Sequence, residues 1–283
     1  MRVFDCHLHL EPAEMISVSS RRLFEQTRSD YDRVQHYVHD PRSFLGYLDE
    51  QEIERVAIIN YVNPEVLGTG PEINDFSAAY CRHDPARLAA FGGIDPRHCT
   101  DVESEFARLL KLGIRGIKVH PPHQGFAANA YREGLEGLAD LYRLCETEGV
   151  PLMVHTGTSI FPGARNVYAD PLPCDDIAVD FPDLKLIVAH GGRPIWMDTA
   201  FFLVRRHPNV FLDLSSIPPQ SLLDHFPRLD SISDKLLFGS DWPGPGVPDI
   251  GANVRRFQAL ALEPETRRKA LYDNAAALFP VLS

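Results

Sequence analysis

Eight short apolar runs recur along this 283-residue chain, and longer amphipathic segments separate them. The runs at 185–189 and 209–214 are almost continuously apolar, which is typical of parallel strands that are covered on both faces. Eight strand–helix units in a chain of this length predict a closed (β/α)8 TIM barrel of the α/β class, with residues 1–283 as a single domain. An open doubly wound sheet is the alternative, but no glycine-rich phosphate loop follows the first run.

The expected elements follow from apolar periodicity and from the residues that start and stop helices. Strands are expected at 2–9, 55–60, 88–94, 115–120, 151–155, 184–190, 209–214 and 235–241. Helices are expected at 131–148, 196–206, 219–226 and 264–279, the last of them on the barrel exterior. Thr100 to Glu103 has the form of a capping box for a further helix, which Gly113 ends.

Residues 11–40 interrupt the alternation of strands and helices, because a long polar stretch separates the first strand from its helix. Loops of this length in compact domains are usually functional or disordered. We interpret the stretch as a lid inserted over the barrel mouth, and a solvated loop with a short helix is the alternative. Four arginines in it are candidate anion contacts: Arg21, Arg22, Arg28 and Arg33.

Composition limits the partners. A formal net charge of -11 argues against nucleic acid, since phosphate binding needs a basic surface. The five cysteines are scattered and form no CxxC pair, which favours reduced thiols. The sequence contains no secretion signal and no apolar run that could span a bilayer, so we expect a cytoplasmic protein without a membrane partner. A small-molecule substrate is the expected partner, and a homo-oligomer is compatible with the sequence.

The first strand carries the motif Asp5-x-His7-x-His9. Side chains alternate between the two faces of a strand, so His7 and His9 are expected on one face and Cys6 and Leu8 on the other. Two neutral imidazoles at this spacing can bind one divalent transition metal.

Later strand ends supply further candidate groups. His155, His190 and Asp241 each follow an apolar stretch directly, and in a barrel the carboxyl ends of the strands meet at one mouth. A single such histidine is usually a hydrogen-bonded structural residue. Several at the same end of different strands indicate a functional site.

In the order and combination of these motifs, the chain resembles the amidohydrolase superfamily, and specifically its amidohydrolase-2 branch of hydrolases and decarboxylases. The matching motifs are Asp5-x-His7-x-His9, Gly-Ile-Lys118-Val-His120-Pro, His155-Thr-Gly, Ala-His190-Gly-Gly and Gly-Ser-Asp241-Trp-Pro. The resemblance implies that His7, His9, His155 and Asp241 bind a metal, with zinc expected, and that His190 is an acid, a base or a polarising group beside it.

The chemistry of the side chains agrees with this ligand set. Three imidazoles and one carboxylate suit zinc and are compatible with manganese, iron or cobalt. Asp241 could also take a proton from a metal-bound water, and Asp5 could hydrogen-bond a ligand histidine or simply be buried beside the site.

Lys118 leaves the number of metals open. In two-metal members of the superfamily the corresponding lysine is carboxylated and bridges both ions. We favour one metal, with Lys118 as a substrate-anion contact or as an ion-pair partner of Asp241. His120, Arg193 and Trp242 are further candidate substrate contacts, whereas His123 is expected in a solvated loop. Aromatic residues that could wall the pocket are Tyr61, Phe126, Phe161, Trp196 and Trp242.

Two enzymatic functions fit these residues. The first is a metal-dependent hydrolase that activates water against an ester, lactone or amide of a small organic acid. The second is a metal-dependent decarboxylase of a small or aromatic carboxylic acid. Hydrolysis is the slightly favoured expectation, because water activation is the default chemistry of an open metal position. A non-catalytic metal-binding barrel is the third hypothesis.

Overall fold

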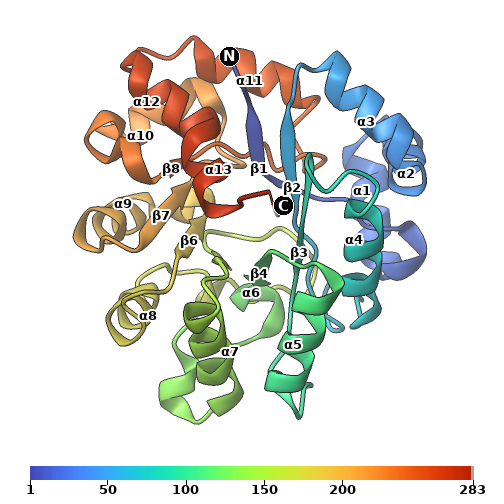
Figure 1. Ribbon diagram of the computed structural model, residues 1–283, viewed down its shortest axis with the longest axis vertical. Coiled ribbons are helices and arrows are strands. Elements are labelled where there is room, and N and C mark those ends of the chain that lie inside the picture. The colour runs from blue at the N-terminus through green and yellow to red at the C-terminus, as the bar shows by residue number, and fades with distance from the viewer. Residues whose placement is uncertain (282–283) are drawn as a thin grey trace.

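The computed structural model describes residues 1–281 and forms an eight-stranded parallel sheet in which the strands neighbour one another in chain order. The strands are β1 (Phe4–Leu8), β2 (Arg55–Ile58), β3 (Leu88–Gly92), β4 (Gly116–Val119), β5 (Leu152–His155), β6 (Leu186–Ala189), β7 (Val210–Asp213) and β8 (Leu236–Leu237). The strands occupy the centre of the molecule and the helices surround them (Figure 1). The expected TIM barrel is confirmed.

Backbone hydrogen bonds join the first strand to the last segment of the barrel. Cys6 N donates to Phe238 O at 2.9 Å, Asp241 N to His7 O at 2.8 Å and His9 N to Trp242 O at 2.8 Å. Residues 238–242 therefore lie beside β1 and continue the short β8. This pairing carries Asp241 to the same end of the barrel as His7 and His9.

The helices alternate with the strands, as a parallel sheet requires. They are α1 (Val18–Thr27), α2 (Tyr31–His39), α3 (Pro41–Glu50), α4 (Glu72–Cys81), α5 (Val102–Leu112), α6 (Pro121–Gln124), α7 (Glu136–Thr147), α8 (Cys174–Asp180), α9 (Met197–Arg206), α10 (Leu222–His225), α11 (Ile250–Gln258), α12 (Pro264–Arg268) and α13 (Asn274–Leu278). Within residues 1–281, no helix combines the length and the apolar character that crossing a membrane would need.

Two helix boundaries differ from the prediction. Asp101, not Thr100, caps α5, because its side chain accepts a hydrogen bond from Ser104 N at 2.9 Å. The helix expected at 131–148 is divided by Gly134, whose φ of 101° cannot continue a right-handed helix. Gly113, with a φ of 101°, ends α5 as predicted.

The segment 11–40 is mostly helical rather than a loop, since it contains α1 and α2. Of its four arginines, Arg28 is buried, and its guanidinium donates to the carbonyl oxygens of Pro243 at 3.0 Å and Val247 at 2.7 Å. Arg28 therefore holds the loop that follows β8 and is not available as a surface anion contact. Arg21 and Arg33 pair with Glu25 and Asp30.

The end of the chain does not pack only on the barrel exterior, which corrects the expectation from the sequence. A π-helical turn, Lys269–Asp273, joins α12 to α13. Phe279 packs against Phe4 and Phe91 at ring-centre distances of 6.0 and 5.3 Å, so it belongs to the apolar cluster inside the barrel. The C-terminal segment therefore covers one end of the barrel interior. The other end, where the strands have their carboxyl ends, is left available for an active site.

A register irregularity between Asp5 and Leu8 changes the faces of β1. Leu8 packs in the outer core as expected, but Cys6 belongs to the interior cluster with Phe4 and Met153. The prediction that Cys6 and Leu8 share one face of the strand is therefore wrong. An extra residue in a strand breaks the simple alternation of side chains.

Candidate active site

A cavity of about 260 Å³ opens at the carboxyl ends of the strands. Its walls include His9 after β1, Lys118 on β4, His155 at the end of β5, His190 after β6 and Asp241 after β8. The convergence that the sequence predicted for these strand ends is therefore present in the fold.

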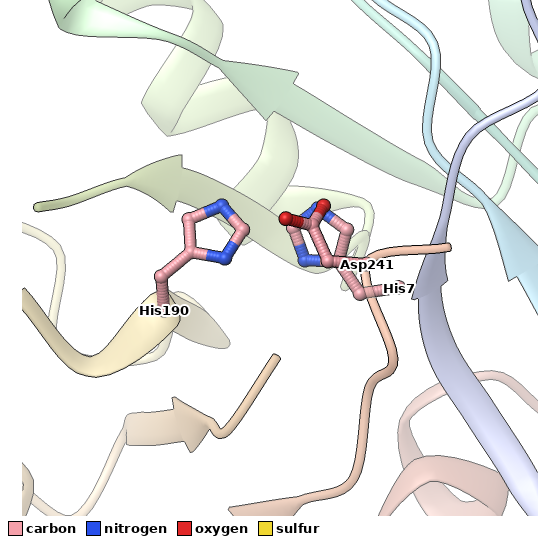
Figure 2. A group of neighbouring side chains, drawn as sticks. All are labelled: His7, His190 and Asp241. Atoms are coloured by element: carbon pink, nitrogen blue, oxygen red, sulfur yellow. The ribbon is translucent and has the colours of Figure 1, made fainter. Parts of the chain in front are cut away.

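Three ligand-type atoms lie close together at the base of this cavity. His7 Nε2 lies 3.2 Å from His9 Nε2 and 3.7 Å from Asp241 Oδ1, and His9 Nε2 lies 3.3 Å from the same oxygen. His7, His190 and Asp241 also offer one ligand atom each within 4.8 Å of one another. Figure 2 shows how these three side chains approach one another from separate strand ends.

Each imidazole of the expected ligand set has its second nitrogen next to an acceptor. His7 Nδ1 lies 2.6 Å from Asp213 Oδ2, and His9 Nδ1 lies 3.1 Å from Glu11 Oε1. His155 Nε2 lies 3.1 Å from the carbonyl oxygen of Gly157, which can only accept. A neutral imidazole that donates from one nitrogen keeps a lone pair on the other, so the contacts of His7 and His155 prepare two nitrogens to bind a cation. The contact of His9 with Glu11 is an ion-pair distance without hydrogen-bond geometry.

His190 is held by a chain of two hydrogen bonds. Ser215 Oγ donates to Asp213 Oδ2 at 2.7 Å, so its oxygen can accept from His190 Nδ1 at 2.9 Å. The neutral His190 ring then has its lone pair on Nε2. The ring centre of His190 lies 4.7 Å from that of His7 and 4.6 Å from that of His155, so it stands between two expected ligands.

Burial controls the charge of these groups. It lowers the pKa of His7 to about 4, and it lowers the pKa of His155 and His190 well below the usual value. Burial also opposes protonation of His9, but Glu11 and Asp241 outweigh it and raise the His9 pKa to about 9. Metal binding needs the neutral ring, so loading the site would release the His9 proton.

Asp241 remains ionised. Burial would raise the pKa of its carboxyl group, but His9 and His7 hold that pKa well below the usual range. His190 and Asp241 both have left-handed backbone conformations, with φ values of 60° and 62°. Such strain in residues other than glycine concentrates at functional sites, where the surrounding structure holds it in place.

Two cationic side chains border the same cavity. Lys118 is 1% exposed, and its Nζ contacts Met153 Sδ at 3.4 Å. Burial lowers the pKa of Lys118 to about 8, although Asp213 and Asp241 favour its charged form. Arg193 donates to Thr158 O at 2.8 Å, and its second amino group lies 3.9 Å from Asp241 Oδ2. Both groups can attract a substrate anion.

Imidazole and aromatic rings form another wall. His120 is stacked between His123 and His155 at ring-centre distances of 3.6 and 3.7 Å. Tyr61 and Phe161 also line the cavity, as expected. His123 is buried and lines the cavity too, so its expected position in a solvated loop is wrong.

Three aromatic residues do not take the expected position on the cavity wall. Trp242 is 1% exposed and packs in the outer core against Phe44 and Tyr47, at ring-centre distances of 6.1 and 5.4 Å. Trp242 therefore does not line the cavity as a substrate contact, contrary to the prediction. Consecutive residues after β8 point in opposite directions, so Asp241 faces the cavity and Trp242 faces the outer core. Phe126 and Trp196 also lie outside the cavity lining.

Three polar residues of the site are not among those that the sequence motifs select: Glu11, Asp213 and Ser215. Asp213 ends β7, and the rule that selects His155 and Asp241 also applies to it. Asp213 is missed from the sequence alone because the run 209–214 is interpreted as almost continuously apolar. Asp5 accepts from the backbone N of His7 at 3.1 Å and of Ser240 at 2.9 Å rather than from a histidine ring.

Comparisons with solved structures agree with the fold. An uncharacterized TIM-barrel protein of Bordetella bronchiseptica has a TM-score of 0.78 at 21% identity, over 98% of both chains. A 2,6-dihydroxybenzoate decarboxylase complexed with 2,6-dihydroxybenzoate has a TM-score of 0.73 at 18% identity, over 99% of both chains. A 5-carboxyvanillate decarboxylase from Novosphingobium aromaticivorans, complexed with manganese and 4-hydroxy-3-methoxy-5-nitrobenzoic acid, has a TM-score of 0.71 at 16% identity, over 98% of this chain and 96% of that one.

Sequence comparison assigns the family. None of the curated proteins compared with this chain matches it. The family model described as Amidohydrolase, of the amidohydrolase-2 type, matches residues 4–281, which is almost the whole chain and includes every strand end described above. The chain therefore belongs to the amidohydrolase-2 family.

Proposed function

We propose that this protein is a metal-dependent decarboxylase of a small aromatic carboxylic acid. The observation that carries the proposal is the convergence of His7 Nε2, His9 Nε2 and Asp241 Oδ1 within 3.7 Å of one another, beside a cavity that Lys118 and Arg193 also line. The ligand atoms suit a divalent cation, and the two cationic side chains suit a carboxylate.

Four residues would hold one divalent ion: His7, His9, His155 and Asp241. Nitrogen and oxygen donors in this mixture fit either zinc or manganese. When bound, the ion would supply a positive charge that attracts oxygen atoms of the substrate. Asp213 fixes the ring of His7 through its second nitrogen, and Glu11 lies at an ion-pair distance from His9.

The lining of the cavity supports an aromatic, anionic substrate. Tyr61, His120 and Phe161 provide ring surfaces, and Arg193 provides a fork of donors for a carboxylate. The ligands named for the two structurally similar decarboxylases are a dihydroxybenzoate and a substituted hydroxybenzoic acid. We infer the same general class of ligand for this cavity.

Decarboxylation breaks the carbon–carbon bond to the carboxylate, so that CO2 leaves and the electron pair stays on the ring carbon. A proton must then replace CO2 on that carbon. Asp241 is ionised and borders the cavity, so it can collect a proton from a substrate hydroxyl and return it to carbon. His190 Nε2 presents a lone pair that can accept a hydrogen bond from the same hydroxyl.

Hydrolysis uses the same residues, because Asp241 could instead take a proton from water. The sequence alone slightly favours this reaction. The cationic groups in the cavity and the nature of the two similar enzymes give more support to decarboxylation, so hydrolysis becomes the second candidate.

One experiment separates the two reactions. The purified protein is stripped of metal, reloaded with zinc or manganese, and incubated with a panel of hydroxybenzoates and of aromatic lactones. We expect metal-dependent loss of a benzoate with one equivalent of CO2 released. Lactone opening without CO2 would favour the hydrolase, and no turnover with either metal would contradict the proposal.

A further inference from the structure

A second polar chain lies in the cavity wall and takes no part in the chemistry described above. Tyr61 Oη lies 2.9 Å from His123 Nδ1, and His123 Nε2 lies 2.7 Å from Ser159 Oγ. All three residues line the cavity. His123 is at the far end of a row of imidazoles in which each ring is stacked on or packed against the next: His7, His190, His155, His120 and His123.

A count of hydrogen atoms shows that the hydrogen-bonded series Tyr61, His123 and Ser159 always leaves one donor free. Burial lowers the pKa of His123 to about 3, so its ring is neutral and carries one N–H. The two hydroxyl groups and this N–H contribute three hydrogens, but the chain contains only two hydrogen bonds. Within residues 1–281, neither hydroxyl donates to any other protein acceptor, so one O–H remains free.

Burial decides which end of the chain has the free hydrogen. Tyr61 is 4% exposed, whereas Ser159 is partly exposed and lines the cavity. A free hydroxyl hydrogen at the buried end would be an unsatisfied donor, while one at Ser159 can reach water or a ligand. Tyr61 therefore donates to His123 Nδ1, and His123 Nε2–H donates to Ser159 Oγ.

The position of Ser159 is fixed by further contacts. Phe161 N donates to Ser159 Oγ at 3.3 Å, and Asn166 holds the serine backbone through Ser159 N at 2.8 Å and Ser159 O at 3.1 Å. With two donors on its oxygen, the serine hydroxyl hydrogen has to point away from both of them. His123 Nε2, the nitrogen that faces Ser159, already carries a hydrogen. It cannot take the serine proton, so this arrangement does not activate Ser159 as a nucleophile.

We propose that Ser159 is a substrate-binding residue whose free hydroxyl hydrogen donates to a second oxygen atom of the substrate, and that Tyr61 and His123 are positioning residues that keep this hydrogen free. The inference rests on the proposed function, because it assumes that a small carboxylate occupies the cavity. It adds a preference for acids that carry an oxygen atom besides the carboxylate and the hydroxyl group that faces Asp241 and His190, such as a second ring hydroxyl group.

Binding selectivity tests the proposal. Affinities of the manganese-loaded protein for benzoate, for the three monohydroxybenzoates and for dihydroxybenzoates are measured by calorimetry, at a temperature at which no CO2 is released, in the wild type, in Ser159→Ala and in Ser221→Ala. Ser221 is a partly buried serine outside the cavity and serves as the control. We expect at least one dihydroxybenzoate to bind about threefold to tenfold more tightly than the matching monohydroxybenzoate, the effect of one neutral hydrogen bond. Ser159→Ala should lose this preference and Ser221→Ala should keep it.

Two further measurements test the hydrogen bonds between Tyr61, His123 and Ser159. Imidazole nitrogen chemical shifts should show His123 protonated on Nε2, and phenylmethanesulfonyl fluoride should leave Ser159 unmodified. Protonation on Nδ1, stoichiometric labelling of Ser159, or unchanged selectivity in Ser159→Ala would each overturn the inference. If the wild-type protein binds no benzoate, the proposed function fails and the inference with it, whereas binding with unchanged selectivity contradicts the inference alone.

Discussion

His7 Nδ1 and Asp213 Oδ2 are 2.6 Å apart, and both side chains are fully buried. The carboxylate fixes the orientation of the ring and leaves Nε2 free to bind a cation. Burial would raise the pKa of Asp213, but His7 and Ser215 lower it, so the acceptor stays ionised.

This contact predicts the effect of Asp213→Asn, which keeps the size of the side chain and removes its charge. We expect metal affinity to fall by about 10- to 100-fold, as is usual when the partner of a ligand histidine is changed. Competition with a chelator of known affinity measures the change. Asp140→Asn, at an exposed position, is the control. Equal affinities in the two variants would show that Asp213 does not support the ligand.

Removal of a ligand should have a larger effect. In His7→Ala the protein should be purified with less than stoichiometric metal, because one of the converging nitrogen atoms is lost. Elemental analysis after gel filtration gives the metal-to-chain ratio. His225→Ala removes an exposed imidazole outside the site and should not change this ratio. Full occupancy in His7→Ala would contradict the ligand assignment.

Asp241→Asn separates chemistry from folding. Loss of the carboxylate should reduce turnover by about 100- to 10,000-fold, the usual contribution of a positioned acid–base group. Circular dichroism and thermal unfolding should be close to those of the wild type. Near-normal turnover in a folded, metal-loaded variant would exclude Asp241 as the group that moves the proton.

Arg28 connects the helical segment 11–40 with the loop after β8, which lines the cavity through Pro243, Gly244 and Pro245. In Arg28→Met the carbonyl oxygens of Pro243 and Val247 lose a charged donor, at a cost of about 2 kcal/mol. We expect faster amide exchange in residues 243–249 and a lower Tm. Arg22→Met changes an exposed arginine and should leave both properties unchanged. Unaltered exchange in Arg28→Met would mean that the loop is held by other contacts.

The cysteines should react in a fixed order. Burial raises the pKa of Cys174 to about 12 and that of Cys81 and Cys145 still further, so these thiols stay protonated at pH 8. Cys99 is only partly buried. A disulfide reagent at pH 8 should therefore modify about one thiol in the folded protein, at Cys99, and the others only after unfolding. Rapid modification of several thiols in the folded protein would contradict their burial.

The sequence by itself determined the barrel and the strand ends that carry the site. Apolar runs of strand length, separated by helical segments, leave few other architectures, and the carboxyl ends of parallel strands must share one side. For this reason the order of residues along the chain is enough to select His7, His9, His155, His190 and Asp241.

Only the tertiary structure decided which polar groups support those residues and which rings line the cavity. Asp213 and Ser215 act through contacts with residues more than 20 positions away in the chain, which local periodicity does not encode. The register irregularity in β1 then placed Cys6 and Leu8 on different faces, and the turn after β8 reversed the expected face of Trp242. A side chain's direction depends on backbone angles at single residues, and these are fixed by packing between strands that are distant in sequence.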